Sequence, residues 1–126
     1  MAMTAHVVYE AIDPTAPSTT SAKVVREVVR GEIGFDGLLI SDDTSMKALS
    51  GDFPDKAAAI LAAGVDIVLH CNGVMAEMRG IVSKTTALQG KSLGRAERAL
   101  GFISGGDAVA EADIRREFAG YFDAIA

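Results

Sequence analysis

The sequence contains little that would cross-link the chain or attract nucleic acid. Its 126 residues include one cysteine, Cys71, so no disulfide can form within the chain. No apolar run reaches the roughly 18 residues of a membrane span, and the opening MAMTAHVVYE lacks the pattern of a signal peptide. The net charge of −5 argues against nucleic acid as the main partner. We therefore expect a soluble, cytoplasmic protein with no membrane or nucleic-acid partner.

Several signatures of cofactor and metal sites are also missing. Neither GxGxxG nor GxxxxGK[ST] occurs, so no loop for nucleotide phosphates is predicted. Two histidines, one cysteine and no CxxC argue against zinc. The adjacent Asp42 and Asp43 could bind Mg²⁺, but no second acidic cluster supports that site. We expect no metal and no cofactor.

Aromatic residues are scarce, at 6% with no tryptophan, while aliphatic residues are abundant. This composition suits an α/β fold with buried parallel strands. The pattern alternates strand and helix, which predicts parallel strands joined by crossover helices. Three strands would leave two unpaired edges, so the sequence resembles part of a larger α/β domain. The predicted strands are 2–9, 37–41 and 65–71, and the predicted helices are 22–30 (capped by Ser21), 54–63, 74–89, 92–100 and 108–124.

Polar side chains mark the predicted strands at the edge where parallel α/β folds build active sites. Asp42 and Asp43 end the second strand, His6 lies in the first, and 70–72 (His-Cys-Asn) end the third. A structural explanation is that Asp43 or Ser45 caps the following segment. The convergence of three polar strand ends favours a cleft.

Three stretches resemble bacterial β-N-acetylhexosaminidases of glycoside hydrolase family 3, near the C-terminal part of those enzymes. They are MTAHVVYEAIDPTAPSTTS, GEIGFDGLLISDDTSMKAL and AAGVDIVLHCN, which together span roughly residues 2–73. The resemblance implies that the whole of 1–126 is a partial (β/α)8 barrel: its last three βα units, with additional C-terminal helices.

The resemblance also implies roles for individual residues. Asp42, the first acid of SDD, corresponds to the catalytic nucleophile of a retaining glycosidase. Met46 and His6 are the candidate substrate-binding residues, and Asp43 is expected to support the Asp42 loop by hydrogen bonding. The implied partner is a glycan with terminal β-linked N-acetylglucosamine, derived from recycled cell-wall muropeptides.

The family's acid/base histidine lies in a motif resembling KHFPGHG, and no such motif occurs here. The sugar-binding residues of the first five barrel strands are not matched either. General acid–base catalysis is worth about 10²–10⁴-fold, so we expect this chain alone to have little or no activity.

Three interpretations remain open at the level of sequence. The first is a hexosaminidase fragment, and the second is a non-catalytic module that forms a homo-oligomer through its exposed sheet edges. The third is a small flavodoxin-like binding domain, which would need further strands after residue 73.

Overall fold

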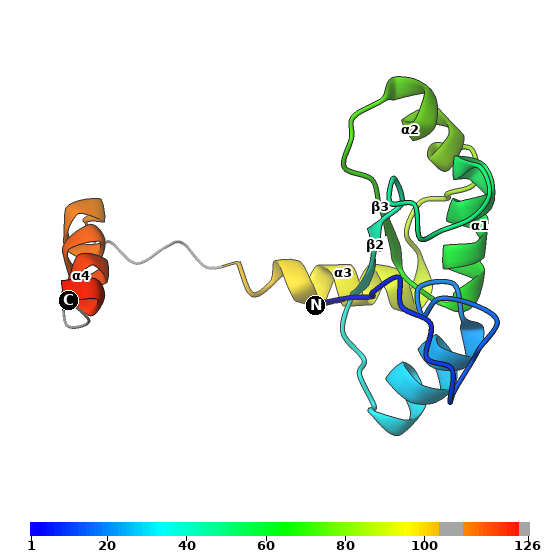
Figure 1. Cartoon of the computed structure of the whole chain (residues 1–126), viewed down its shortest axis with the longest axis horizontal. Helices are drawn as coiled ribbons and strands as arrows, with labels where there is room; N and C mark the ends of the chain where they lie inside the picture. The colour runs from blue at the N-terminus through cyan, green and yellow to red at the C-terminus, as the bar shows by residue number, and fades with distance from the viewer. Residues whose placement is uncertain (104–109, 124–126) are drawn as a thin grey trace.

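The computed structural model describes residues 1–103 and 110–123. Strands and helices alternate as predicted, and Figure 1 shows the strands at the centre with α1 beside them. The ends of the predicted helix 108–124, at 108–109 and 124, lie outside the described residues. The elements are β1 (Ala2–Met3), η1 (Val24–Glu32), β2 (Leu39–Asp43), α1 (Phe53–Ala63), β3 (Ile67–Leu69), α2 (Met75–Val82), α3 (Gly90–Leu100) and α4 (Glu111–Asp123).

The three strands form one parallel sheet in the order β1-β2-β3, as the alternation predicted. The expected strand 2–9 is wrong in length, because β1 ends at Met3 and only the Thr4 amide continues the pairing, donating to Ile40 at 2.9 Å. Beyond it the chain bonds to its own loop instead, where the Ser18 amide donates to the Val7 carbonyl at 2.8 Å. The third strand, expected over 65–71, is likewise shorter.

The hydrophobic core lies between one face of the sheet and the helices η1 and α1. The other face carries a row formed by Met3, Ile40 and Ile67, which are paired across the three strands. Met3 is 56% exposed, so this row is not covered as the core face is. The sheet therefore has one packed face and one open apolar face. The core cluster contains Val25, Leu39, Leu49, Ile60, Ala63 and Val65.

The beginnings of the first two helices follow from local hydrogen bonding. Ser21 accepts a hydrogen bond from the Val24 amide at 3.1 Å, which confirms the predicted cap. Hydrogen bonds from Ser21 and Thr15 lower the pKa of Asp13 to about 2. The helix that follows Ser21 is largely of the π type. At α1, the Asp52 carboxylate accepts from the Asp55 amide at 2.9 Å.

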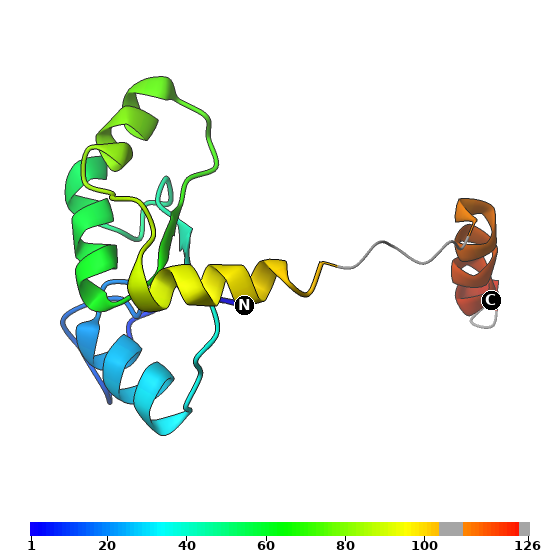
Figure 2. The same ribbon diagram turned by 180° about the vertical axis from the view of Figure 1, so that it is seen from behind.

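The helix predicted over 74–89 is too long, because α2 ends at Val82. The hydroxyl groups of Ser83 and Thr85 donate to carbonyl groups of the last turn, at 2.6 and 3.2 Å. Such bonds from side chain to backbone compete with helix propagation. Segment 83–89 then leads to α3, which Figure 2 shows passing the lower end of the sheet.

At the beginning of β3, a buried carboxylate ties several elements together. The Asp66 side chain is 2% exposed and accepts from Arg30 at 2.7 Å, from Arg95 at 3.0 Å and from the Leu39 amide at 2.9 Å. Ser92 adds a hydrogen bond at 2.6 Å. Burial raises the pKa of Asp66, but these hydrogen bonds outweigh it and hold the pKa below its ordinary value. The network joins η1, β2, β3 and α3.

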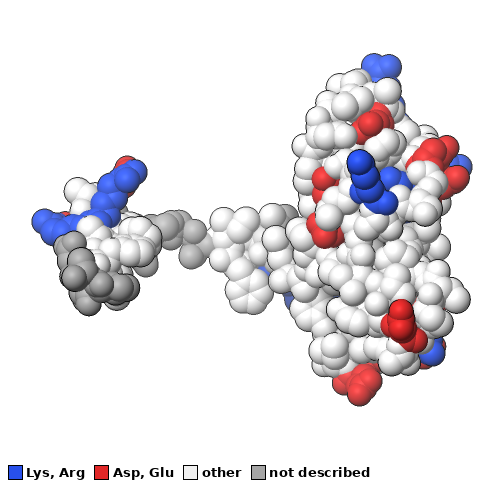
Figure 3. Space-filling model, viewed as in Figure 1, with Lys and Arg blue, Asp and Glu red and all other residues white. Residues whose placement is uncertain are grey.

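Charge and apolar surface are distributed unevenly over the molecule. On the face seen in Figure 3, acidic and basic side chains form small separate groups over a mostly uncharged surface. Helix α4 lies apart from the sheet in Figure 1, and it carries a stripe of exposed, large apolar side chains. Among the described residues, no helix is long and apolar enough to cross a membrane. The exposed stripe comprises Ile114, Phe118, Tyr121 and Phe122.

We expect Asp66→Ala to lower the free energy of unfolding by about 3 kcal/mol, because it leaves buried arginine charge without its partner. Asp36→Ala provides the matched control: Asp36 also bonds Arg95, but its side chain is 72% exposed and should contribute far less. Urea unfolding followed by circular dichroism measures both variants. Equal losses would contradict the central role of Asp66.

Candidate active site

The polar strand ends predicted from sequence do meet at one edge of the sheet. The His6 ring donates from Nε2 to the Asp43 carbonyl at 3.0 Å, which links the segment after β1 to the end of β2. The Cys71 amide donates to Asp43 Oδ1 at 3.1 Å and links the segment after β3 to the same residue. Asp43 is thus the point at which the three strand ends converge.

The Asp43 carboxylate is occupied by hydrogen bonds from other residues of the chain. Its carboxylate accepts from the Ser45 amide at 3.0 Å, from the Ser45 hydroxyl and from the Cys71 amide. The hydrogen bond from the Ser45 hydroxyl is the main cause that lowers the pKa of Asp43, so this residue stays ionised well into the acid range. These contacts agree with both sequence expectations, a capping acid and a support for the Asp42 loop.

Asp42 is placed differently from its neighbour. Among the described residues, its carboxylate accepts one hydrogen bond, from the Asp43 amide at 2.8 Å, and the side chain is half-buried. The preceding Ser41 is fully buried and accepts from the Leu69 amide at 2.8 Å, which anchors this part of β2. A firmly held backbone with a lightly bonded carboxylate fits a group that must reach a reacting atom.

Thr44 completes the turn and is fully buried. Its amide donates to the Leu69 carbonyl at 3.0 Å, and its own carbonyl accepts from Lys56 Nζ at 3.1 Å. Lys56 is 9% exposed, and its Nζ lies 4.9 Å from the centre of the Phe53 ring. Sequence reasoning missed Lys56, although its position four residues before Ile60 places it on the buried face of α1.

The two candidate substrate-binding residues have different surroundings. Both ring nitrogens of His6 are engaged, since Nδ1 lies 2.9 Å from the Thr19 hydroxyl and Nε2 bonds Asp43. Met46 lies on the Asp42 turn, where its amide donates to the Asp43 carbonyl at 3.1 Å, and it is 44% exposed. Met46 is therefore open to a ligand, whereas His6 is held in a bonded position.

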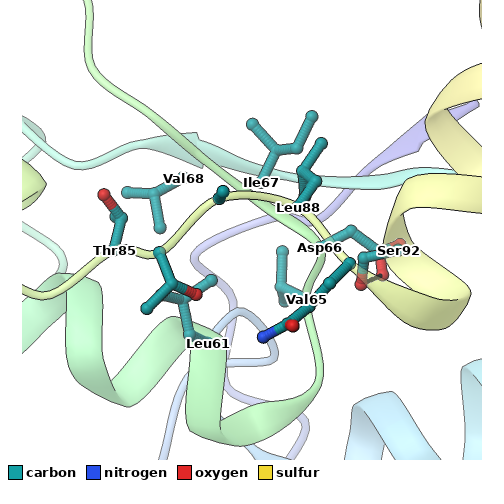
Figure 4. Close-up of a pocket in the computed structure, with 11 residues that line it drawn as sticks. Leu61, Val65, Asp66, Ile67, Val68, Thr85, Leu88 and Ser92 are labelled. Carbon is teal, nitrogen blue, oxygen red and sulfur yellow. Dashed lines mark hydrogen bonds between the residues drawn. The ribbon is translucent and has the colours of Figure 1, made fainter.

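A cavity of about 440 Å³ lies between α1, β3 and the segment that leads to α3 (Figure 4). Leu61, Val65 and Leu88 give it an apolar lining, and Asp66 and Ser92 contribute polar groups. The Asp66 carboxylate is already bonded, and the stretch at β3 that lines the cavity, 65–68, ends before Leu69 and the polar residues that follow it. This cavity is therefore separate from the turn that carries Asp42.

The thiol of Cys71 offers a chemical test of this arrangement. Desolvation and then the charge and hydrogen bond of Asp43 raise the pKa of the thiol, with Asp42 adding repulsion. Because the thiolate is the reacting form, Asp43→Asn should lower this pKa and speed alkylation by iodoacetamide at neutral pH severalfold. Cys71 is exposed already, so access is not limiting. Asp55→Asn, on α1, should leave the rate unchanged; unchanged alkylation in Asp43→Asn would contradict the geometry.

The chain is similar to curated bacterial enzymes over most of its length. It is 50% identical over 72 residues to a β-hexosaminidase of Alkalilimnicola ehrlichii, which covers 56% of this chain and 20% of the relative. It is 38% identical over 105 residues to a β-hexosaminidase of Tolumonas auensis, which covers 82% of this chain and 30% of that protein. The chain thus spans less than a third of the length of these relatives.

Solved structures show the same similarity. The β-N-acetylglucosaminidase of Thermotoga maritima superposes with a TM-score of 0.65 at 31% identity, covering 82% of this chain and 25% of that one. The β-N-acetylhexosaminidase of Beutenbergia cavernae gives a TM-score of 0.56 at 35% identity, covering 64% of this chain and 25% of that one. Residues 1–98 match the Glycosyl hydrolase family 3 N terminal domain, and the chain belongs to this family of glycoside hydrolases.

Proposed function

We propose that this chain forms the nucleophile-bearing part of a β-N-acetylhexosaminidase barrel. Parallel strands, helices on one face and an open apolar row of Met3, Ile40 and Ile67 on the other support this proposal. In a (β/α)8 barrel, helices cover the outside and apolar side chains fill the inside. The three strands would be the last three of eight, and the open row would face the barrel interior.

Asp42 is the proposed nucleophile, and the single observation that carries this assignment is the contrast with Asp43. Ser45 and Cys71 bond the Asp43 carboxylate, while that of Asp42 accepts only the adjacent amide among the described residues. Asp42 also lies at the carboxyl end of a parallel strand, where barrel enzymes place catalytic groups.

The proposed chemistry is retaining hydrolysis in two steps. A carboxylate oxygen of Asp42 attacks the anomeric carbon, and the bond to the leaving oxygen breaks as an acid protonates that oxygen. Water, deprotonated by the same group, then attacks the anomeric carbon and releases Asp42. The acid is not assigned to any residue of this chain, so we propose that 1–126 alone is nearly inactive.

The proposed substrate is a glycan that ends in β-linked N-acetylglucosamine. The names of the relatives support this class, since they include β-hexosaminidases and a β-N-acetylglucosaminidase. We further propose a role in cytoplasmic recycling of cell-wall muropeptides. Met46 is the proposed sugar contact on the turn, and His6 is proposed to act by holding the end of β2 next to the sugar.

Complementation tests the nucleophile. The chain alone should not release nitrophenol from an aryl β-N-acetylglucosaminide, whereas co-expression with the unmatched remainder of a relative's barrel should restore release. In the restored enzyme, Asp42→Asn should lower kcat on the order of 10⁴-fold or more, as removal of a covalent nucleophile does. Asp55→Asn is the control and should retain activity. Full activity in Asp42→Asn would contradict the assignment.

A second candidate function, an assembly module, is favoured by the outer edges of β1 and β3, which pair with no other strand within the described part of the chain. The amides of Ala2 and Thr4 donate towards β2. The Met3 amide between them therefore points the other way, to the outer edge of β1. An apolar groove of about 370 Å³ adjoins that edge, and its lining includes Val29 of η1 and Ile33, which directly follows η1. In this candidate, the β1 edge of one copy pairs with the β3 edge of another.

Light scattering tests assembly directly. If copies associate through the groove beside β1, Ile33→Lys should shift the mass towards the monomer, because a charge would be buried at the contact. Val82→Lys on α2 is the matched control, since Val82 is 66% exposed and Ile33 is 67% exposed. A monomeric unmodified chain, or equal effects of the two changes, would rule out this candidate.

A further inference from the structure

His70 is a buried histidine that the proposed chemistry does not use. Its side chain is 7% exposed and sits just beyond β3, against the turn of Asp42 and the helix α2. Nδ1 lies 3.1 Å from the Thr44 hydroxyl, and Nε2 lies 3.2 Å from Oε2 of Glu77. The Phe53 ring and the imidazole pack edge to face, with the ring centres 5.3 Å apart and the ring planes 80° apart. The ring is thus enclosed on both its polar sides.

The groups next to the two ring nitrogens of His70 indicate which nitrogen carries the proton. Nε2 of His70 and Oε2 of Glu77 are both buried, and among the described residues neither has a hydrogen-bond partner of good geometry, so each is the nearest available partner of the other. Since a carboxylate oxygen can only accept, a hydrogen bond across the 3.2 Å between these two atoms would need a proton on Nε2. In the neutral ring, Nδ1 would then accept, and the Thr44 hydroxyl lies within reach as its donor. The same hydroxyl also lies 3.0 Å from the Leu69 carbonyl, so its one proton has two acceptors to choose between.

The order of groups resembles a hydroxyl–histidine–carboxylate relay that would activate a nucleophile. Burial excludes that role here. Thr44 is 0% exposed, so no substrate atom can approach its hydroxyl in this structure. The relay is therefore more consistent with holding the hydroxyl in place than with activating it.

Three groups hold Thr44, and each comes from a different direction. The Leu69 carbonyl accepts its amide, and Lys56 donates to its carbonyl. Its hydroxyl lies between two acceptors, the Leu69 carbonyl at 3.0 Å and Nδ1 of His70 at 3.1 Å. Thr44 is two residues from Asp42, so a shift of Thr44 would move the carboxylate as well. Glu77 fixes the tautomer of His70 and hence the direction in which the hydroxyl points.

We propose that His70 and Glu77 are a positioning pair that orients the Thr44 hydroxyl and thereby fixes the turn carrying Asp42. Its catalytic importance rests on the proposed role of Asp42, but the geometric claim does not. Neither residue touches the reacting atoms. The pair connects α2 to the candidate active site through one imidazole ring.

The test uses ¹⁵N-detected NMR of the unmodified full chain, at a pH high enough for both of its imidazole rings to be neutral. The proposal expects the proton of His70 on Nε2. His6 serves as an internal reference, because its Nε2 donates to a backbone carbonyl and must also carry the proton. A proton found on Nδ1 of His70 would overturn the proposal without any variant.

Two substitutions at one position then separate orientation from packing. Glu77→Gln keeps an oxygen acceptor and should retain the Nε2 proton, while Glu77→Met removes the acceptor at similar length. In Glu77→Met the proton should move to Nδ1, which then donates to the Thr44 hydroxyl and leaves the Leu69 carbonyl, 3.0 Å away, as the one remaining acceptor for the hydroxyl proton among the described residues. That carbonyl already accepts the Thr44 amide, so we expect roughly fivefold faster hydrogen exchange of this amide, equivalent to one weakened hydrogen bond.

Each outcome bears on the proposal in a defined way. A tautomer change and faster Thr44 exchange in Glu77→Met, but not in Glu77→Gln, would support it. The same tautomer and exchange rate in both variants would overturn it. None of these measurements depends on enzymatic turnover, so a failure of the Asp42 assignment in the complementation assay would be recognised separately.

Discussion

The Asp66 carboxylate determines how the other elements are placed. It lies where β3 begins, and its donors come from η1, from the first residue of β2 and from α3. Because the donor on β2 is the Leu39 backbone amide, the contact also helps to set the register between β2 and β3. The register then shifts between Ile40 and Asp43, so that Asp43 lies beside Leu69 at the carboxyl ends of the two strands.

At the opposite end of these strands, two adjacent acids have different tasks. Asp43 gathers hydrogen bonds from its own turn and from the segment after β3, and it offers its carbonyl to His6. The Asp42 carboxylate makes none of these hydrogen bonds among the described residues and accepts from the Asp43 amide instead. Adjacent residues on a strand point to opposite sides, so one can serve the framework while the other faces the open side. Asp43 therefore supports the turn, whereas Asp42 presents its carboxylate to the open side; the two acids do not form one joint binding site.

The sequence predicted most of what depends on local patterns. The Ser21 cap and the helix that ends before Gly64 are local features, and both were predicted. The length of β1 was not, because His6 and its neighbours bond to a loop more than ten residues away instead of continuing the sheet. The sequence placed His70 among the polar strand ends, but its contact with Thr44 was not foreseen, and Lys56 was missed altogether, because in both cases the partner Thr44 lies at least twelve residues away.

The open row of Met3, Ile40 and Ile67 also affects how the chain responds to heat. The heat capacity change of unfolding grows with the apolar surface that is newly exposed to water. A sheet with one face exposed to solvent in the folded state has less apolar surface left to expose on unfolding than a sheet covered on both faces. Its stability should therefore vary with temperature along a flatter curve, and covering the row would make that curve more sharply domed.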